Sequence, residues 1–206
     1  MSQADDITRW IRGLADPDPA KRLAAATQLQ LVASTLCQSA INEWNENLEF
    51  RELLLPFLAD AAGKPNHGKT PFVTGIAVQP DNFEQIRTAN GSPRLADVPP
   101  DQDALEFELR FGDHADFDIL TTREPGGSGV IARYLQKFGE GIQQIEILAT
   151  NVDRATEILG TQFHLAPIYP ATRAGADGTR VNFFLAAAPG NKRVLIEIVE
   201  AKARES

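Results

Sequence analysis

The chain has 206 residues, of which 43% are apolar and 23% charged, and its formal net charge is −8. This composition excludes wholesale disorder, because it supplies enough apolar surface for a hydrophobic core. The acidic balance argues against a nucleic-acid-binding protein, since such proteins need a basic surface to bind phosphates. The single cysteine, Cys37, excludes an intramolecular disulfide and gives no indication of an oxidising compartment.

No segment of the sequence predicts a membrane anchor. The longest strongly apolar run, 53–59, is broken by Pro56 and is far shorter than the roughly 20 residues that span a bilayer. The N-terminus lacks the basic and apolar regions of a signal peptide. We therefore expect a soluble cytoplasmic protein that binds neither membranes nor nucleic acids.

Residues 1–62 have the pattern of a helical segment. Asp6 can cap a first helix, whose apolar residues recur every three or four positions. These residues are Ile7, Trp10, Ile11 and Leu14. Asp18 followed by Pro19 predicts the start of a long second helix. A further helix is expected from about Ile41 to Ala62, bent near Pro56. The simplest interpretation of the segment is a helical appendage that packs on the main domain or on a partner subunit.

After a polar linker at 63–70, the pattern changes to short alternating strands. Residues 73–78 predict a strand, and a helix is expected from about 81 to Asn90-Gly91. Strict alternation over 105–111 predicts a half-buried strand, and 116–120 predicts another after a turn. We assign 71–125 to a first half of the domain, with a weaker strand near 93–98.

The same order of elements recurs in a second half at 142–201. Residues 142–149 predict a strand, and Asn151 can cap a helix through Leu159. Strands are then expected at 179–187 and 194–199, with a weaker one near 163–172. Residues 73–78 align with a segment 71 residues further along, and 117–119 with a segment 79 residues further along. The sequence therefore predicts an α+β fold of two βαβββ repeats, joined by a connection at 126–141 and preceded by the helical segment.

Two parts of the second half resemble a known superfamily. Residues 134–145 read YLQKFGEGIQQI, and the closing strands contain GADGTRV at 175–181 and VLIEIVE at 194–200. They are similar to the epimerase-like branch of the vicinal oxygen chelate superfamily, whose members include glyoxalase I, methylmalonyl-CoA epimerase and extradiol dioxygenases. The resemblance is clearest over 130–200, and 71–125 fits by pattern. It implies a glyoxalase-like fold, a small-molecule ligand and a homodimer.

The resemblance also implies a divalent metal held by four side chains, two from each half. Carried over residue by residue, these positions fall on Val73, Asp118, Gln144 and Glu197. The epimerase-like branch has histidine at the first and third positions, whereas Val73 cannot ligate and Gln144 offers an amide oxygen. The candidate cofactor is Mg²⁺, Mn²⁺, Zn²⁺ or Ni²⁺, and three oxygen ligands (Asp118, Gln144, Glu197) favour the harder ions over Zn²⁺. The histidines of the chain are His67, His114 and His164, at none of these positions.

Strand parity gives an independent expectation about the faces of the sheet. Apolar residues beside Asp118 and Glu197 are suited to pack on the helices, so these two carboxylates are expected on the opposite face. The same parity is expected to place there Glu106, Glu108, Arg110, Gln144, Glu146, Arg180 and Asn182. Among them we take Glu108, Arg110, Arg180 and Asn182 as candidate substrate-binding residues, the arginines for a carboxylate or phosphate. The alternative is that alternation only marks the solvated faces of amphipathic strands.

Two functions stay open. In the first, an epimerase- or lyase-type reaction passes through a metal-bound enolate, with Glu197 as the catalytic residue, first a ligand and then a base. In the second, a relative without metal binds a small molecule or a protein and catalyses nothing. The acidic residue at 197 favours the first, and the missing histidines favour the second. We therefore expect a glyoxalase-like small-molecule-binding protein with a degenerate or unusual metal site, whose ligand the sequence does not identify.

Overall fold

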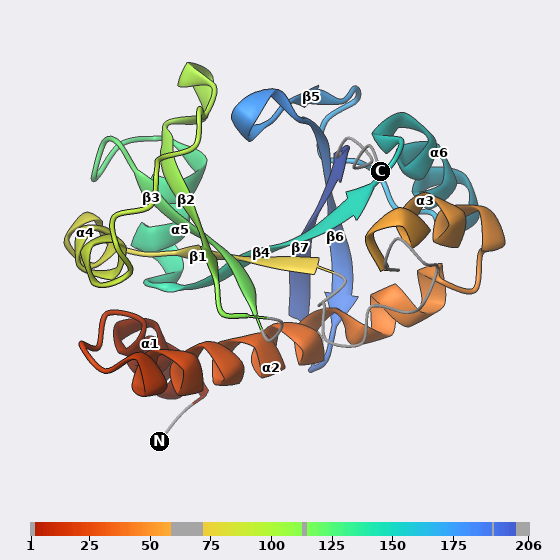
Figure 1. The fold of residues 1–206 in the computed structure, drawn as a ribbon. Helices are drawn as coiled ribbons and strands as arrows, with labels where there is room; N and C mark the ends of the chain where they lie inside the picture. The colour runs from red at the N-terminus through yellow and green to blue at the C-terminus, as the bar shows by residue number, and fades with distance from the viewer. Residues whose placement is uncertain (1–2, 59–71, 113–114, 191, 201–206) are drawn as a thin grey trace. The chain divides into compact units, whose positions relative to one another are not determined.

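A computed structural model describes residues 3–58, 72–112, 115–190 and 192–200 (Figure 1). The chain divides into two compact units. Unit 1 combines residues 1–33 with 74–143, and unit 2 combines 34–73 with 144–206. The N-terminal helical segment is therefore shared between the two units. The linker expected at 63–70 lies outside the described residues.

Three helices make up the described N-terminal segment: α1 (Gln3–Gly13), α2 (Pro19–Trp44) and α3 (Leu48–Leu58). The helix α2 begins at Pro19 as expected, and the Oδ1 atom of Asp18 accepts a hydrogen bond from the backbone N–H of Ala20 at 2.9 Å. The expected start of the third helix near Ile41 is wrong. The α2 helix continues to Trp44, and Asn47 caps α3 by accepting from the backbone N–H of Phe50 at 2.9 Å.

Unit 1 contains the first repeat. Its elements are β1 (Phe72–Ala77), α4 (Pro80–Ala89), a 3₁₀ turn (Pro100–Gln102), β2 (Ala104–Arg110) and β3 (Asp116–Thr122). The strand order is β2-β3-β1, with β1 and β3 parallel and β2 and β3 antiparallel. The weak strand expected near 93–98 does not form, and one backbone hydrogen bond, from Ala96 to Glu106, marks its place.

The core of unit 1 lies between its strands and the helices α1, α2 and α4. Ile11, Leu14 and Leu29 from the first two helices are fully buried in the same cluster as strand residues such as Ile76 and Phe117. Apolar residues with this spacing bury one stripe of each helix, which removes apolar surface from water. The first two helices are therefore part of the core of this repeat.

The connection after β3 contains a helix that the sequence reasoning did not predict. It is α5 (Val130–Phe138), which follows the glycine-rich run and buries Ile131, Ala132 and Leu135. The hydroxyl of Tyr134 donates to the carbonyl of Ile142 at 2.8 Å, and burial raises the pKa of that hydroxyl to about 12. The helix thus fixes the entry into the next strand.

Unit 2 contains the second repeat. Its elements are β4 (Gly141–Ala149), α6 (Val152–Gln162), β5 (Arg173–Ala174), a 3₁₀ turn (Ala176–Gly178), β6 (Arg180–Ala188) and β7 (Lys192–Glu200). The strand order is β4-β7-β6-β5, with β4 and β7 parallel. The weak strand expected near 163–172 is reduced to β5 and a single bridge between Pro167 and Phe184. Asn151 caps α6 as predicted, accepting from the backbone N–H of Arg154 at 2.9 Å.

Helices α3 and α6 of unit 2 lie side by side (Figure 1). The Arg154 guanidinium donates to both carboxylate oxygens of Glu49 at 2.5 and 2.6 Å, and these bonds lower the pKa of Glu49. The backbone N–H of Thr150 also donates to the carbonyl of Leu53 at 3.0 Å. Polar contacts therefore attach α3 to the second repeat.

The registers of the two parallel strand pairs confirm the internal duplication residue by residue. Gly75 of β1 lies opposite Asp118 of β3, and Glu146 of β4 lies opposite Glu197 of β7. These are the pairs that the sequence offsets of 71 and 79 residues connect. The fold is α+β, and the two repeats share the same local arrangement of strands.

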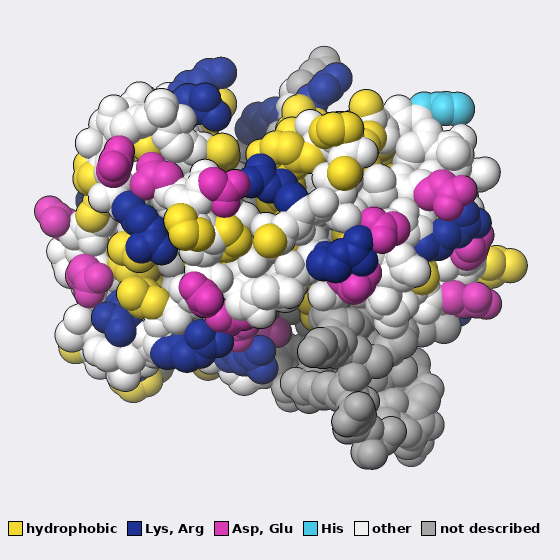
Figure 2. Space-filling model, turned by 90° about the horizontal axis from the view of Figure 1, so that it is seen from above, with side chains coloured by type: hydrophobic (Ala, Val, Ile, Leu, Met, Phe, Trp, Pro, Cys, Tyr) yellow, Lys and Arg dark blue, Asp and Glu magenta, His cyan; other side chains and the backbone are white. Residues whose placement is uncertain are grey.

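The surface gives two further observations. No helix in the described ranges is long and apolar enough to cross a membrane. On the face drawn in Figure 2, basic and acidic side chains are interspersed. On this face, the basic side chains do not form a continuous surface of the kind that binds phosphates.

Candidate functional site

Unit 2 carries polar side chains on the face of its strands that lies away from α6. Ile196 and Ile198 of β7 are fully buried on the α6 side, and Glu197 between them faces the other way. Glu146 lies directly opposite Glu197, and Gln144 is two residues earlier on β4, on the same face. We call this surface the polar face of unit 2. By strand parity its other members include Leu148 of β4, Leu195, Val199 and Arg193 of β7, Val181, Phe183, Leu185 and Ala187 of β6, and Arg173 of β5.

Gln144 and Glu197 form a buried hydrogen-bonded pair on this face. The Nε2 atom of Gln144 donates to the Oε2 atom of Glu197, and each residue is only 8% exposed. A buried carboxylate is costly unless hydrogen bonds or charges compensate for the lost water. The amide of Gln144 supplies part of that compensation, so the pair is held in a defined geometry.

Unit 1 has an equivalent face, and the structure places three predicted residues on it. Glu108 lies opposite Asp118 across β2 and β3, and Arg110 lies opposite Asp116. Asp118 is 5% exposed, whereas Glu108 and Arg110 are mostly exposed and form an ion pair with a distance of 3.0 Å between Nη2 and Oε2. The expected orientation of these side chains is confirmed, and the exposed arginine is partly neutralised by its neighbour.

The expected orientation of Arg180 and Asn182 is wrong. In β6 they lie opposite Glu200 and Ile198, so they face α6, while Phe183 lies opposite Glu197 on the polar face. Arg180 donates to Asp153 of α6 at 2.6 Å, and this hydrogen bond lowers the pKa of that carboxyl. The fully buried amide of Asn182 contacts the Thr156 hydroxyl of the same helix at 3.5 Å. Both side chains therefore serve the packing of α6.

The donor set does not fit the four-ligand metal site that the resemblance implies. Val73, half-buried on β1, has no ligating atom, and the Gln144 side chain turns its Nε2 atom, which cannot bind a metal, toward Glu197. Among the residues that the structure describes, no group of three His, Cys, Asp or Glu side chains is placed to hold a metal ion. His164 does not supply an imidazole there, because it is exposed in a left-handed turn with a φ of 54°. His67 and His114 lie outside the described residues.

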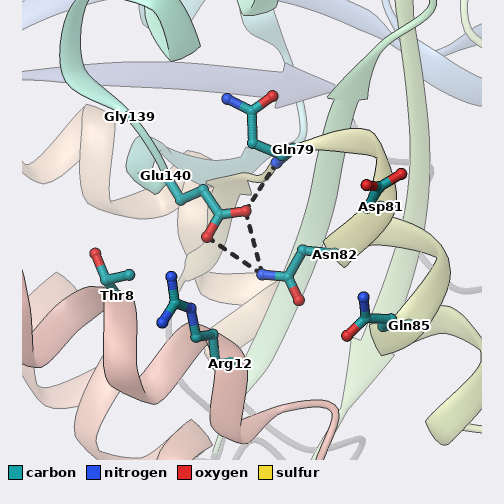
Figure 3. Close-up of a pocket in the computed structure, with 8 residues that line it drawn as sticks. All are labelled: Thr8, Arg12, Gln79, Asp81, Asn82, Gln85, Gly139 and Glu140. Atoms are coloured by element: carbon teal, nitrogen blue, oxygen red, sulfur yellow. Dashed lines mark hydrogen bonds between the residues drawn. The ribbon is translucent and has the colours of Figure 1, made fainter.

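A separate cavity of about 510 Å³ lies in unit 1 (Figure 3). Its lining comes from α1, from the start of α4 and from the turn before β4. The lining residues are Thr8, Arg12, Gln79, Asp81, Asn82, Gln85, Gly139 and Glu140. No sequence pattern links these three segments, so sequence reasoning missed the cavity.

Hydrogen bonds in this cavity show a structural role for its central carboxylate. The Oε1 atom of Glu140 accepts from the backbone N–H of Gln79 at 2.9 Å and from the Asn82 amide at 3.2 Å (Figure 3). A negative charge at a helix N-terminus is favourable because the helix dipole is positive there. Glu140 therefore stabilises the start of α4, and its carboxylate is committed to that contact.

Comparison with solved structures finds methylmalonyl-CoA epimerases among the similar folds. The enzyme from Mycobacterium tuberculosis is 29% identical with a TM-score of 0.50, over 64% of this chain and 87% of that one. A variant of the Streptomyces coelicolor enzyme in complex with 2-nitronate-propionyl-CoA is 22% identical, with a TM-score of 0.53, over 67% and 98%. A hypothetical protein from Bacillus halodurans C-125 is 23% identical, with a TM-score of 0.53, over 66% and 97%. No protein-family profile and no curated protein matches the sequence.

Proposed function

We propose that this chain, which has the vicinal oxygen chelate fold of the methylmalonyl-CoA epimerases, binds a small organic molecule on the polar face of unit 2, around a degenerate metal site. The observation that carries the proposal is the buried Gln144–Glu197 pair. Buried polar side chains on a sheet face away from its covering helix cost stability, which a binding role would explain.

The charges of the polar face favour one kind of ligand. Glu146 and Glu197 are direct neighbours there, and Gln144 adds an amide. Two basic residues share this face by strand parity. Arg193 is four residues from Glu197 and therefore about 13 Å away along the strand. Arg173 lies opposite Val181 on β5, and its guanidinium stacks on the Tyr169 ring at 4.5 Å. Two carboxylates attract hydrogen-bond donors and positive charge, and they repel anions. We therefore expect the ligand to present donor groups to Glu197 rather than a carboxylate.

This expectation differs from the ligands named for the similar structures. One methylmalonyl-CoA epimerase was solved with methylmalonyl-CoA and NH4⁺, and methylmalonyl-CoA carries a carboxylate and phosphates. Of the two arginines that were candidates for such an anion, Arg180 contacts α6 instead, and Arg110 forms an ion pair with Glu108. Metal-assisted enolate chemistry, with Asp118, Gln144 and Glu197 around a divalent ion and Glu197 as base, is the competing function, and it requires a bound ion.

The proposal can be tested by direct titration. Isothermal titration calorimetry with EDTA present would compare methylmalonyl-CoA with cationic and neutral hits from a thermal-shift panel. We expect donor-rich compounds to bind, and Glu197→Gln to weaken them at least tenfold, or about 1.4 kcal/mol. The matched control is Glu52→Gln, which changes an exposed glutamate of α3 in the same way. Binding that is equally strong in Glu197→Gln, or that requires a divalent ion, would contradict the proposal.

The homodimer that the resemblance implies stays a proposal. Sedimentation equilibrium of the full chain distinguishes a monomer of 22.5 kDa from a dimer directly. A ligand-binding role for the polar face requires neither state.

A further inference from the structure

The polar face shows a disagreement between the superfamily pattern and the hydrogen bonding of this chain. In the pattern, the residues at positions 144 and 197 both bind one ion. Here the amide of Gln144 donates to the carboxylate of Glu197, and both side chains are buried. The two positions that would meet at a metal therefore meet each other.

We infer that Gln144 replaces the metal ion in this protein: its amide holds the Glu197 carboxylate that an ion would otherwise hold, so that the polar face is organised without a divalent metal. Gln144 is then a positioning residue, and Glu197 is the group that contacts the ligand. Only the statement that Glu197 contacts the ligand rests on the proposed function.

The chemistry of the two side chains supports this exchange. A histidine at position 144 would offer a ring nitrogen lone pair that binds a metal, whereas the amide nitrogen of glutamine has no lone pair available for a metal. Glutamine offers an N–H of comparable reach, which makes a charge-assisted hydrogen bond to the carboxylate. At position 73, where the superfamily pattern has its other histidine, this chain has valine. Both departures therefore act in the same direction, against an ion and in favour of the pair.

The backbone at these positions keeps the arrangement of the repeat. Gly75 lies opposite Asp118 and Glu146 opposite Glu197, and residues 73 and 144 each come two residues before the first member of their pair. Side chains at 73 and 144 consequently lie on the same strand faces as the two carboxylates. Val73 is half-buried. The disagreement with the pattern lies in the side chains.

The first test measures metal dependence in the full-length protein. Elemental mass spectrometry after purification, and titration with Mn²⁺, Zn²⁺ and Ni²⁺, should find no stoichiometric ion, and EDTA should leave the melting temperature unchanged. One equivalent of tightly bound metal that disappears in Glu197→Ala would overturn the inference and leave ligand binding on the polar face standing. Absence of any ligand for this face would defeat the proposed function and leave the metal result intact.

The second test restores the missing ligands. The double substitution Val73→His and Gln144→His should create a Co²⁺ site with visible d–d absorbance and an affinity about 100-fold or more above that of the unmodified chain. The matched control combines Val73→His with Leu148→His, which adds the same number of imidazoles on the same face but further along β4. A folded Val73→His/Gln144→His protein that binds Co²⁺ no better than this control would overturn the inference.

The third test asks whether Gln144 acts through Glu197. Gln144→Leu should lower the melting temperature, because it removes an amide donor from a buried carboxylate. Adding Glu197→Leu should then recover part of the loss, since no charge is left to satisfy. Gln144→Glu should make stability strongly pH-dependent, with a higher melting temperature at pH 5 than at pH 8, because one proton must be shared by the two carboxylates. Independent, additive losses and a flat pH profile would show that Gln144 does not hold Glu197.

Discussion

The packing of the N-terminal helices on the first repeat leads to a quantitative prediction. Leu29 and Leu31 both lie in α2, two residues apart. Leu29 is fully buried in the cluster that contains Ile76 and Phe117, whereas Leu31 is 61% exposed. Substituting each by alanine makes the same chemical change in the same helix, so the comparison isolates the effect of burial.

The expected magnitude follows from the buried atoms. Leu29→Ala removes three carbon groups, which at about 0.8 kcal/mol each amounts to about 2.4 kcal/mol. A cavity that collapses only in part raises the expected loss to about 3 kcal/mol. For a chain of this length, 1 kcal/mol corresponds to roughly 2–4 °C in melting temperature. Leu29→Ala should therefore melt roughly 6–12 °C below the unmodified protein.

Differential scanning calorimetry measures this shift directly. Leu31→Ala should change the free energy of unfolding by no more than about 0.5 kcal/mol, because the side chain is largely in water already. If both variants melt at the same temperature, α2 is not part of the core of unit 1, and the fold described for this region is wrong.

Further predictions concern three single side chains. Asn151→Ala removes the cap of α6 and should cost about 1 kcal/mol in urea unfolding, whereas Asn151→Ser should keep most of it. Burial raises the pKa of the Cys37 thiol to about 12, so iodoacetamide should not label the folded protein at pH 8 but should label it in urea. Because this pKa is raised in the folded state, ionisation of Cys37 should make the free energy of unfolding fall as pH rises above about 9. Cys37→Ala should flatten that slope, and equal slopes in the two proteins would refute the raised pKa. Carbon-detected NMR should find Asp153 titrating below its usual range, and Arg180→Gln should move the pKa back up.

The order of elements could be predicted because each repeat follows simple sequence patterns. Alternation in 105–111 and the Asn151 cap correspond to β2 and to the start of α6. The two sequence offsets also predicted which residues are equivalent in the two repeats, and the registers of the parallel strand pairs agree with them. Periodicity and capping are local, so a sequence displays them directly.

The failures involve choices that depend on tertiary contacts. Because Arg180 and Asn182 are polar, they were predicted on the face away from the helices. They lie on the face toward α6 instead, where Asp153 and Thr156 of that helix are their hydrogen-bond partners. The glycine-rich run suggested a plain connection and hid the short helix α5, whose buried residues are supported by packing. The orientation of Arg180 and Asn182 and the formation of α5 both depend on contacts with residues far along the chain.

The candidate site was predicted in part. Sequence parity placed Glu197 and Gln144 on one face, and the structure brings them into a hydrogen bond. Their contact could not be foreseen, because it depends on the side-chain conformations of two strands 53 residues apart. The cavity beside Glu140 had no sequence signal, since its lining comes from three separate segments.

Methyl NMR with EDTA present tests the central claim most directly, by mapping where small molecules bind to the full chain. The account predicts that hits shift the methyl signals of Leu148, Leu195 and Val199, which share the polar face with Glu197, and leave Ile158 and Leu159 of α6 unchanged. It also predicts that Glu197→Gln weakens those shifts. Hits that perturb only other regions, or that need a divalent ion to bind, would contradict the account.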